Sequence, residues 1–105
     1  MAPTPVEIDG VWLQTMMVDL SEGGLSCAVS SGLLPEPGAP VRVELDIDGE
    51  AVVVNSVVVR SITLPSNESV VAVRFIGLDD RTSDRIRKEV FALQLRQRSR
   101  GGSPE

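Results

Sequence analysis

Residues 41–47 alternate strictly between apolar and charged side chains. The odd positions hold valine, leucine or isoleucine, and the even positions hold arginine, glutamate or aspartate. Successive side chains of a β-strand point to opposite faces, so this pattern predicts a strand with one face in a core and the other in water. Asp48-Gly49 follows directly, and this dipeptide favours the two-residue turn of a β-hairpin. The segment therefore predicts an antiparallel sheet near the middle of the chain.

Strand signals dominate the chain up to residue 76. Valine is the most conspicuous apolar residue of this part, and β-branched residues favour strands. Turn and loop signals divide it at Asp9-Gly10, Glu22–Gly24, Gly32–Pro40, Asp48-Gly49 and Pro65–Asn67. The expected strands cover residues 6–8, 11–20, 25–30, 41–47, 51–62 and 70–76, with a bulge near Asn55-Ser56. Five or six short strands joined by hairpins predict an all-β barrel or sandwich.

A helical pattern replaces the strand pattern towards the end of the chain. Apolar residues recur at i, i+4 and i+7 from Ile86, which is the spacing of one helix face. Asp79 or Asp80 can cap the helix start, because a carboxylate accepts hydrogen bonds from the free N–H groups there. We expect one amphipathic helix from about Asp80 to about Arg96, lying across an open side or end of the strands.

The chain has 105 residues, which is the size of one domain. We expect a single domain over residues 1–97 and a disordered tail over residues 98–105. No apolar run approaches the roughly 20 residues of a membrane span, and the first ten residues do not have the pattern of a signal peptide. The sequence therefore predicts a cytoplasmic protein with no membrane insertion.

The chemistry of the side chains argues against an enzyme. The chain has no histidine and one cysteine, Cys27, so a thiolate metal site and an activated nucleophile such as Ser21 both lack the partners that they need. The segment Asp46–Glu50 faintly resembles a calcium loop, but the later ligands are absent and Asp-Gly is better explained as a turn. We expect no catalytic residue, no metal and no cofactor.

Charge is distributed unevenly along the chain. The net charge is −5, yet residues 81–100 carry seven basic side chains, whereas residues 1–59 carry only Arg42. A basic end can contact an anion, but a solvated helix face is the simpler interpretation. Nucleic-acid binding is disfavoured, because the body is acidic and offers no aromatic platform for bases.

The segment Val18–Leu25 is the part of the sequence most suggestive of a ligand site. Strand alternation would place Asp19 and Ser21 on one side of the chain, and Gly23 and Gly24 would let a flat ligand approach the backbone closely. A carboxylate can accept two hydrogen bonds from the N1–H and N2–H edge of guanine, whereas adenine offers no matching donors there. On these residues alone, an ordinary capped turn is the simpler interpretation.

The order of elements around this segment resembles the PilZ domain, a bacterial receptor module for cyclic di-GMP. The segment Val18–Leu25 matches the family motif Asp/Asn-x-Ser-x-x-Gly. It is followed by Val41–Leu45, Val57–Arg60 and Val71–Phe75, and then by a helix at the expected place. The resemblance covers roughly residues 6–97, which is nearly the whole chain.

The resemblance implies a six-stranded, antiparallel, Greek-key-like β-barrel with a C-terminal α-helix. It implies that Asp19, Ser21 and Gly24 contact a guanine of cyclic di-GMP, and that the domain binds rather than catalyses. It also implies signalling to a partner protein or a neighbouring domain. Arg60 and Arg74 are supporting candidates for ligand binding, suggested only by their place on neighbouring strands.

One motif of the family is not found in this sequence. PilZ domains carry Arg-x-x-x-Arg before the first strand, and this chain has no arginine before Arg42. Arg96 and Arg100 have the same spacing, but they are expected at the end of the helix and are not assigned this role. Losing two arginines would remove charged hydrogen bonds to phosphate worth roughly 1.5–3 kcal/mol each.

Two interpretations of the missing motif stay open. In the first, the arginines lie upstream of a truncated chain. In the second, this is a degenerate PilZ-like domain that binds no nucleotide and acts as a protein–protein interaction module. A missing N-terminal strand or loop would also leave an open strand edge, through which a homodimer could form.

Overall fold

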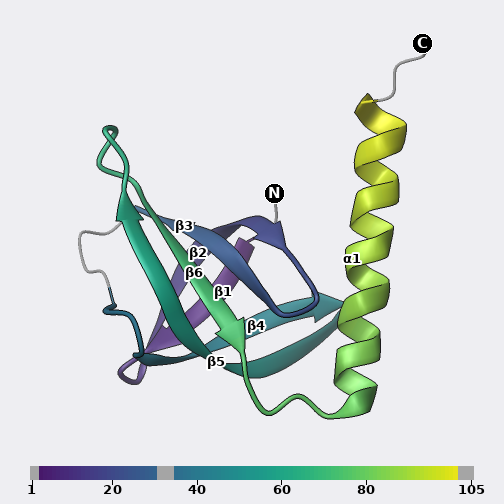
Figure 1. Cartoon of the computed structure of the whole chain (residues 1–105), viewed down its shortest axis with the longest axis horizontal. Helices are drawn as coiled ribbons and strands as arrows, with labels where there is room; N and C mark the ends of the chain where they lie inside the picture. The colour runs from purple at the N-terminus through teal and green to yellow at the C-terminus, as the bar shows by residue number, and fades with distance from the viewer. Residues whose placement is uncertain (1–2, 31–34, 102–105) are drawn as a thin grey trace.

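The computed structural model describes residues 3–30 and 35–101, and in this part of the chain six antiparallel strands precede one helix (Figure 1). The elements are β1 (Pro3–Ile8), β2 (Val11–Leu20), β3 (Gly24–Val29), β4 (Pro40–Ile47), β5 (Glu50–Thr63), β6 (Ser69–Phe75) and α1 (Asp80–Gly101). The strands close into a barrel in the order β1-β2-β3-β6-β5-β4. The all-β fold with a C-terminal helix is therefore confirmed, and of the two predicted architectures the chain forms the barrel.

Two of the predicted turns have the backbone geometry that their residues favour. Asp9 and Gly10 both have positive φ, at 53° and 82°, and so do Asp48 and Gly49, at 54° and 80°. Aspartate and glycine tolerate this left-handed conformation, and two such residues in succession form the turn that matches the twist of a hairpin. These turns join β1 to β2 and β4 to β5.

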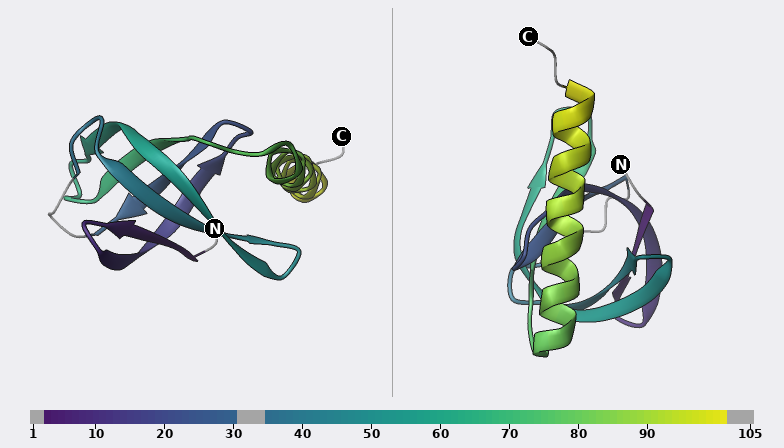
Figure 2. Two further views of the ribbon diagram at one scale, coloured as in Figure 1. Left: turned by 90° about the horizontal axis from the view of Figure 1, so that it is seen from below. Right: turned by 90° about the vertical axis from the view of Figure 1, so that its right-hand side faces the viewer.

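The core fills the barrel with inward-facing aliphatic side chains. Its buried members are Val6, Leu25, Cys27, Val29, Val41, Val43, Leu45, Ile47, Val54, Val58, Val71, Val73, Phe75 and Ile86. Ile86 is the helix's contribution and is fully buried, because α1 crosses one end of the barrel, as the right-hand view of Figure 2 shows. The side chain of Ile86 thus closes the end of the barrel that the strands leave open.

The helix is held at its first half, and further along a cavity lined by Met17, Leu20 and Leu93 separates it from the strands (Figure 1). Asp79 caps it, since Oδ1 accepts a hydrogen bond of 2.7 Å from the N–H of Thr82. Arg85 donates to Glu50 at 2.6 Å. Beyond this region Phe91 and Leu95 remain 62% and 45% exposed. Within the described residues, no helix is long and apolar enough to cross a membrane.

Several boundaries differ from those predicted. β1 begins at Pro3 rather than Val6, because the long β2 provides partners for it as far as Met16. Pro3 and Pro5 are tolerated in β1 although they lack an N–H group. Because β1 pairs with β4 only at Val6 and Glu7, the prolines remove no hydrogen bond between these two strands. The closed barrel also means that the described strands do not offer the unpaired β1 edge on which the expected homodimer depended.

The predicted bulge and the predicted helix end were wrong. Asn55 and Ser56 pair in regular register with β4, and the irregularity of β5 lies between Val58 and Arg60 instead. The helix continues past Arg96 to Gly101, since no helix-breaking residue precedes the glycines. Of the expected disordered tail, 98–101 are helical, whereas residues 102–105 and the loop residues 31–34 lie outside the described part of the chain.

Candidate functional site

A shallow hollow of about 260 Å³ lies on the outside of the barrel where β2 ends and β3 begins. Its lining residues are Asp19, Ser21, Gly23, Gly24, Leu25, Ser26, Ala72 and Val73. The four motif residues expected to bind a ligand are therefore brought together. Ser26 and Ala72 were not predicted to line a site, although both are small side chains at outward positions of the two strands beside the motif.

A β-bulge turns Asp19 towards the solvent. Met17 pairs with Cys27 and Asp19 pairs with Ser26, so two steps along β2 match one step along β3, and Val18 is the extra residue. The side chains of Thr15 and Met17 point into the barrel. Without the bulge, the alternation of side chains along β2 would point Asp19 into the barrel as well. With it, Asp19 is exposed and Leu20 packs against the core instead. Bulges characteristically re-aim side chains in this way beside functional sites.

Asp19 has no structural partner. Of the described residues, none forms a hydrogen bond or an ion pair with its carboxylate. An exposed carboxylate at the edge of a hollow keeps all of its acceptor positions free. Asp19 can thus accept two hydrogen bonds from a ligand without losing any interaction within the protein.

Ser21 is committed in part to the turn. Its N–H donates to the carbonyl oxygen of Gly24 at 2.8 Å, and its hydroxyl donates to the same oxygen at 3.1 Å. A hydroxyl carries one donor and two acceptor lone pairs. The oxygen of Ser21 therefore remains able to accept a hydrogen bond from a ligand while its proton fixes the turn.

Gly24 is required by the packing of β3 on β6. A Cβ atom at this position would lie far inside van der Waals distance of the carbonyl oxygen of Val73, whereas a Cβ at Gly23 would meet nothing within 4 Å. The carbonyl oxygen of Gly23 accepts a hydrogen bond of 2.9 Å from Phe75. The glycine that the motif prescribes at position 24 is thus explained by the fold, independently of any ligand.

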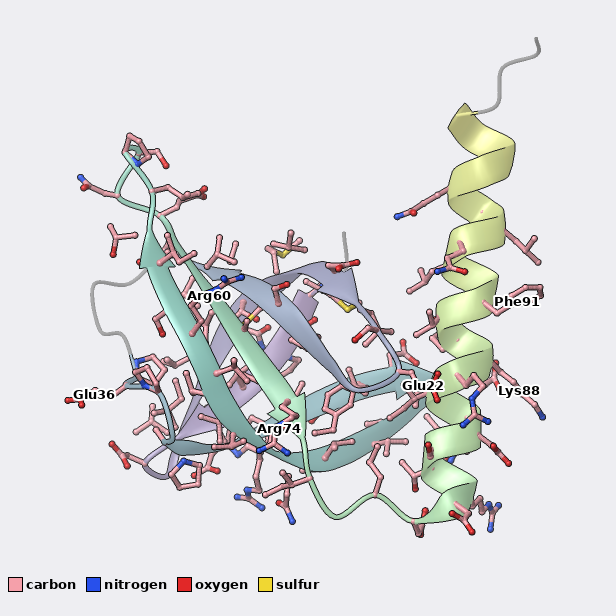
Figure 3. All side chains as sticks on the ribbon, viewed as in Figure 1. Glu22, Glu36, Arg60, Arg74, Lys88 and Phe91 are labelled. Atoms are coloured by element: carbon pink, nitrogen blue, oxygen red, sulfur yellow. The ribbon has the colours of Figure 1, made fainter. Side chains whose placement is uncertain are left out.

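Arg60 and Arg74 are exposed on the outside of the barrel, on β5 and β6 (Figure 3). Arg60 pairs with Ala72, which pairs with Ser26, which pairs with Asp19, so one row of residues joins Arg60 to Asp19 across four strands. Arg74 pairs directly with Gly24. Neither arginine lines the hollow itself. The structure thus places Arg74 next to the motif glycine, whereas Arg60 lies further round the barrel, beside Ala72.

The charges of the barrel leave these two arginines unpaired. Arg42, the third barrel arginine, donates to Glu7 at 2.9 Å and lies 5.5 Å from the ring centroid of Trp12. Its hydrogen bond is the main reason why the pKa of Glu7 lies below its ordinary value. Within the described residues, no carboxylate pairs with Arg60 or Arg74. In a chain of net charge −5, two unpaired guanidinium groups on the adjacent strands β5 and β6 are a local positive site.

The loop of the motif is tied to the helix. Glu22 accepts hydrogen bonds from Nε and an η-nitrogen of Arg87 at 3.2 and 3.1 Å, and Arg87 also pairs with Asp84 at 2.6 Å. These carboxylates raise the pKa of Arg87, with Glu22 the larger cause. The sequence analysis did not assign Glu22 any role, because its partner lies 65 positions further along the chain.

Other predicted features lie away from the hollow. Arg96 pairs with Glu89 at 3.6 Å on the helix, and the side chain of Arg100 is outside the described part of the structure. Cys27 is buried in the core, and burial raises the pKa of its thiol. The described residues contain no group of three or more histidine, cysteine or acidic side chains that could hold a metal ion.

Solved structures with the same fold include two PilZ domains. The Bacillus subtilis inhibitor of motility, MotI/DgrA, superposes with a TM-score of 0.76 at 17% identity, covering 91% of this chain and 48% of that one. The PilZ domain of YcgR from Escherichia coli with c-di-GMP gives 0.73 at 15% identity, covering 94% and 87%. The PilZ domain of CeSA from a cellulose-synthesizing bacterium gives 0.66 at 18% identity, covering 88% and 91%.

These structural similarities establish the fold. This chain spans about half the length of the Bacillus subtilis protein. No curated protein matches the sequence significantly. The family model for the PilZ domain matches residues 1–92, which include the whole barrel, the motif loop and the first half of α1. The sequence order, the closed six-stranded barrel and this match agree, and the chain belongs to the PilZ domain family.

Proposed function

We propose that this domain is a receptor module for cyclic di-GMP and that Asp19 reads a guanine of the ligand. The observation that carries the proposal is that Asp19 is turned outwards by a bulge and left without a partner, whereas Ser21 and Gly24 also serve the fold. The bulge also turns Leu20 towards the core, but the exposed carboxylate of Asp19 makes no contact that the fold uses. A ligand with paired N–H donors, such as guanine, gives that carboxylate a role.

The hollow suits a flat base. Gly23 and Gly24 have no side chains, and Ser26 and Ala72 are small, so the face of a ring can lie close to the strands. Asp19 would accept the N1–H and N2–H hydrogen bonds of guanine, and the Ser21 oxygen would accept a further one. Adenine would leave the carboxylate without donors, which gives the site its preference for guanine.

Arg60 and Arg74 are proposed to face the phosphates. Among the described residues neither has a carboxylate partner; Arg74 pairs with Gly24 and Arg60 pairs with Ala72, and both of these partners line the hollow. Guanidinium groups form paired hydrogen bonds with phosphate oxygens and keep their charge at all physiological pH values. They would supply part of the positive charge that the family obtains from its Arg-x-x-x-Arg motif.

The wider role follows from the family. PilZ domains bind a ligand rather than catalyse, and we propose that this one acts in the cytoplasm of a bacterium and passes the signal to a partner protein or a neighbouring domain. The absence of histidine from the sequence and the burial of Cys27 support a module without catalytic residues.

A second candidate function is a PilZ-like interaction module that binds no nucleotide. The observation that favours it is the free second half of α1, where Phe91 points away from the barrel (Figure 3) and Leu95 is also exposed. Exposed apolar side chains of this size are common at sites that bind other proteins.

Calorimetric titration with cyclic di-GMP distinguishes the two functions. We expect wild-type protein to bind and Asp19→Ala to bind about 10- to 100-fold more weakly, since one or two charged hydrogen bonds are lost. Glu36→Ala is the matched control, because Glu36 is an exposed carboxylate at the end of the barrel opposite the motif loop (Figure 3). Cyclic di-AMP should not bind to any of these proteins.

The absence of cyclic di-GMP binding, by the wild-type chain and by a version extended upstream, would favour the second function. Binding that Asp19→Ala leaves unchanged would instead mean that the nucleotide binds away from Asp19.

A further inference from the structure

A cavity of about 180 Å³ lies between α1 and the strands β1, β2 and β4. Large apolar side chains from β2, β4 and α1 line it, and these are Met17, Leu20, Leu45, Ile47, Ile86 and Leu93. A cavity of about 150 Å³ with such walls can hold a benzene ring. This cavity can therefore hold an apolar group of at least that size, whereas a helix of a partner protein, about 10 Å across, would not fit.

The charged side chains around this cavity are mostly acidic. Glu44 and Asp46 line it from β4, and Glu89 and Arg96 line it from α1. Glu89 and Arg96 pair with each other at 3.6 Å, so their charges offset one another. Of the described residues, none forms an ion pair with Glu44 or Asp46. The rim of the cavity thus carries two carboxylates without a cationic partner.

The edge of β4 adds main-chain acceptors to the rim. Residues from both faces of this strand line the cavity, so the cavity runs along the strand's edge rather than over one face. Ile47 and Glu50 close a two-residue hairpin turn and are hydrogen-bonded to each other, and alternate residues of β4 then direct their main-chain groups away from β5. The carbonyl oxygens of Glu44 and Asp46 therefore point towards β1, where Pro3 has no N–H to donate.

We propose that this cavity binds a small molecule with an apolar body and a primary ammonium group. An ammonium group has three N–H donors and no acceptor, so it suits a rim of carboxylates and carbonyl oxygens. The apolar body would lie between Leu20 and Leu93. A molecule with a carboxylate head group would be repelled by Glu44 and Asp46, and an uncharged one would leave both without a partner.

The proposed amine site is separate from the hollow and stands without nucleotide binding. The bulge of β2 turns Asp19 and Leu20 to opposite sides, so that Leu20 lines the cavity and Asp19 lines the hollow. A ligand in the cavity would contact the strands and the second half of α1 at the same time. Because a ligand stabilises the state that binds it, the amine should slow amide hydrogen exchange in this half of the helix.

Titration of the 105-residue chain with phenethylammonium chloride, followed by nuclear magnetic resonance, tests the site. We expect the methyl signals of Met17, Leu20 and Leu93 to shift, with a dissociation constant on the order of 1 mM for a ligand of this size. Phenylacetate has the same ring and the opposite charge, and it should bind at least about tenfold more weakly. Neutral 2-phenylethanol should lie between the two.

Filling the cavity should exclude the ligand. Leu93→Trp places a larger side chain in the cavity and should abolish the methyl shifts of Met17 and Leu20. Leu95→Trp is the matched control, because it makes the same change on the same helix at a position that is 45% exposed and does not line the cavity. This control should bind phenethylammonium as the wild type does.

Removing the charge of the rim should weaken only the cationic ligand. Glu44→Gln combined with Asp46→Asn should weaken phenethylammonium about fivefold or more and leave 2-phenylethanol unchanged. Asp9→Asn combined with Glu36→Gln is the control, because it removes two exposed carboxylates that do not line the cavity. The absence of methyl shifts with phenethylammonium up to about 10 mM would overturn the proposal. So would phenylacetate that binds equally well, or binding that Leu93→Trp leaves unchanged.

Discussion

Glu22 and Arg87 join the motif loop to the helix by two hydrogen bonds onto one carboxylate oxygen, at 3.1 and 3.2 Å. Glu22 lies between Ser21 and Gly23, so any ligand that contacts this loop acts within one residue of the contact to α1. The helix is otherwise fixed by the buried Ile86 and by Arg85 with Glu50. The loop and the helix are therefore mechanically connected at the surface.

Glu22→Gln should uncouple the helix from the motif loop. Both side chains of the pair are more than half exposed, so we expect the melting temperature to change by only about 2 °C or less. We expect cyclic di-GMP to slow amide hydrogen exchange in the first half of α1 of the wild type, and to have a smaller effect there in the variant. Asp46→Asn, which changes an exposed carboxylate on β4, is the control. Equal protection in variant and wild type would mean that the pair transmits nothing.

Gly24→Ala should destabilise the barrel strongly. The added methyl group would collide with the backbone of Val73, and strands β3 and β6 would have to separate locally. We expect the free energy of unfolding to fall by about 3 kcal/mol or more, measured by urea denaturation. Gly23→Ala is the matched control, because a methyl group there meets nothing, and it should change stability by no more than about 0.5 kcal/mol. Similar losses for the two variants would contradict this explanation of the motif glycine.

Local patterns in the sequence were sufficient to predict the strands and the helix, whereas the choice of a barrel over a sandwich came from the resemblance to the PilZ family. Alternation in residues 41–47 predicted β4, the Asp-Gly pairs predicted two hairpin turns, and the aspartates before the helix predicted the cap that Asp79 forms. Each of these signals depends on neighbours in the chain, and so each can be found by inspection.

The bulges were not predicted because they depend on the partner strands. In β2 a signal did exist: the inward positions pass from the odd residues Thr15 and Met17 to the even residue Leu20, which requires one extra residue. In β5 several successive valines fit either register, so only the pairing with β6 reveals that Val59 is the extra residue. The row that joins Arg60 to Asp19 depends on both bulges and on long-range pairing, and was therefore beyond sequence reasoning.

Ile86→Ala should weaken the attachment of the helix. Ile86 is fully buried at the end of the barrel, and truncation of such a side chain costs about 2–5 kcal/mol of unfolding free energy. Phe91→Ala removes a larger side chain from the same helix, but this one is 62% exposed and should cost no more than about 0.5 kcal/mol. Urea denaturation followed by circular dichroism measures both. A larger loss for Phe91→Ala would show that the free half of α1 is packed in solution.

The cap of the helix should make stability depend on pH. The hydrogen bonds with Thr82, first that of its side chain and then that of its backbone, hold the pKa of Asp79 below its ordinary value. The folded state therefore favours the charged carboxylate of Asp79. This charge stabilises the folded protein at pH values above the pKa that Asp79 has in the unfolded chain, and the stabilisation is lost as the pH falls through the lower pKa of the folded state. Asp79→Asn keeps a capping oxygen but does not titrate.

Denaturation of both proteins between about pH 6 and about pH 3 checks this sign. The advantage of the wild type over Asp79→Asn should be largest at the upper end and should shrink as the pH falls. Glu7, whose pKa is also lowered, titrates in both proteins, so its contribution cancels in the comparison. An advantage that grows towards low pH would contradict the cap as the cause.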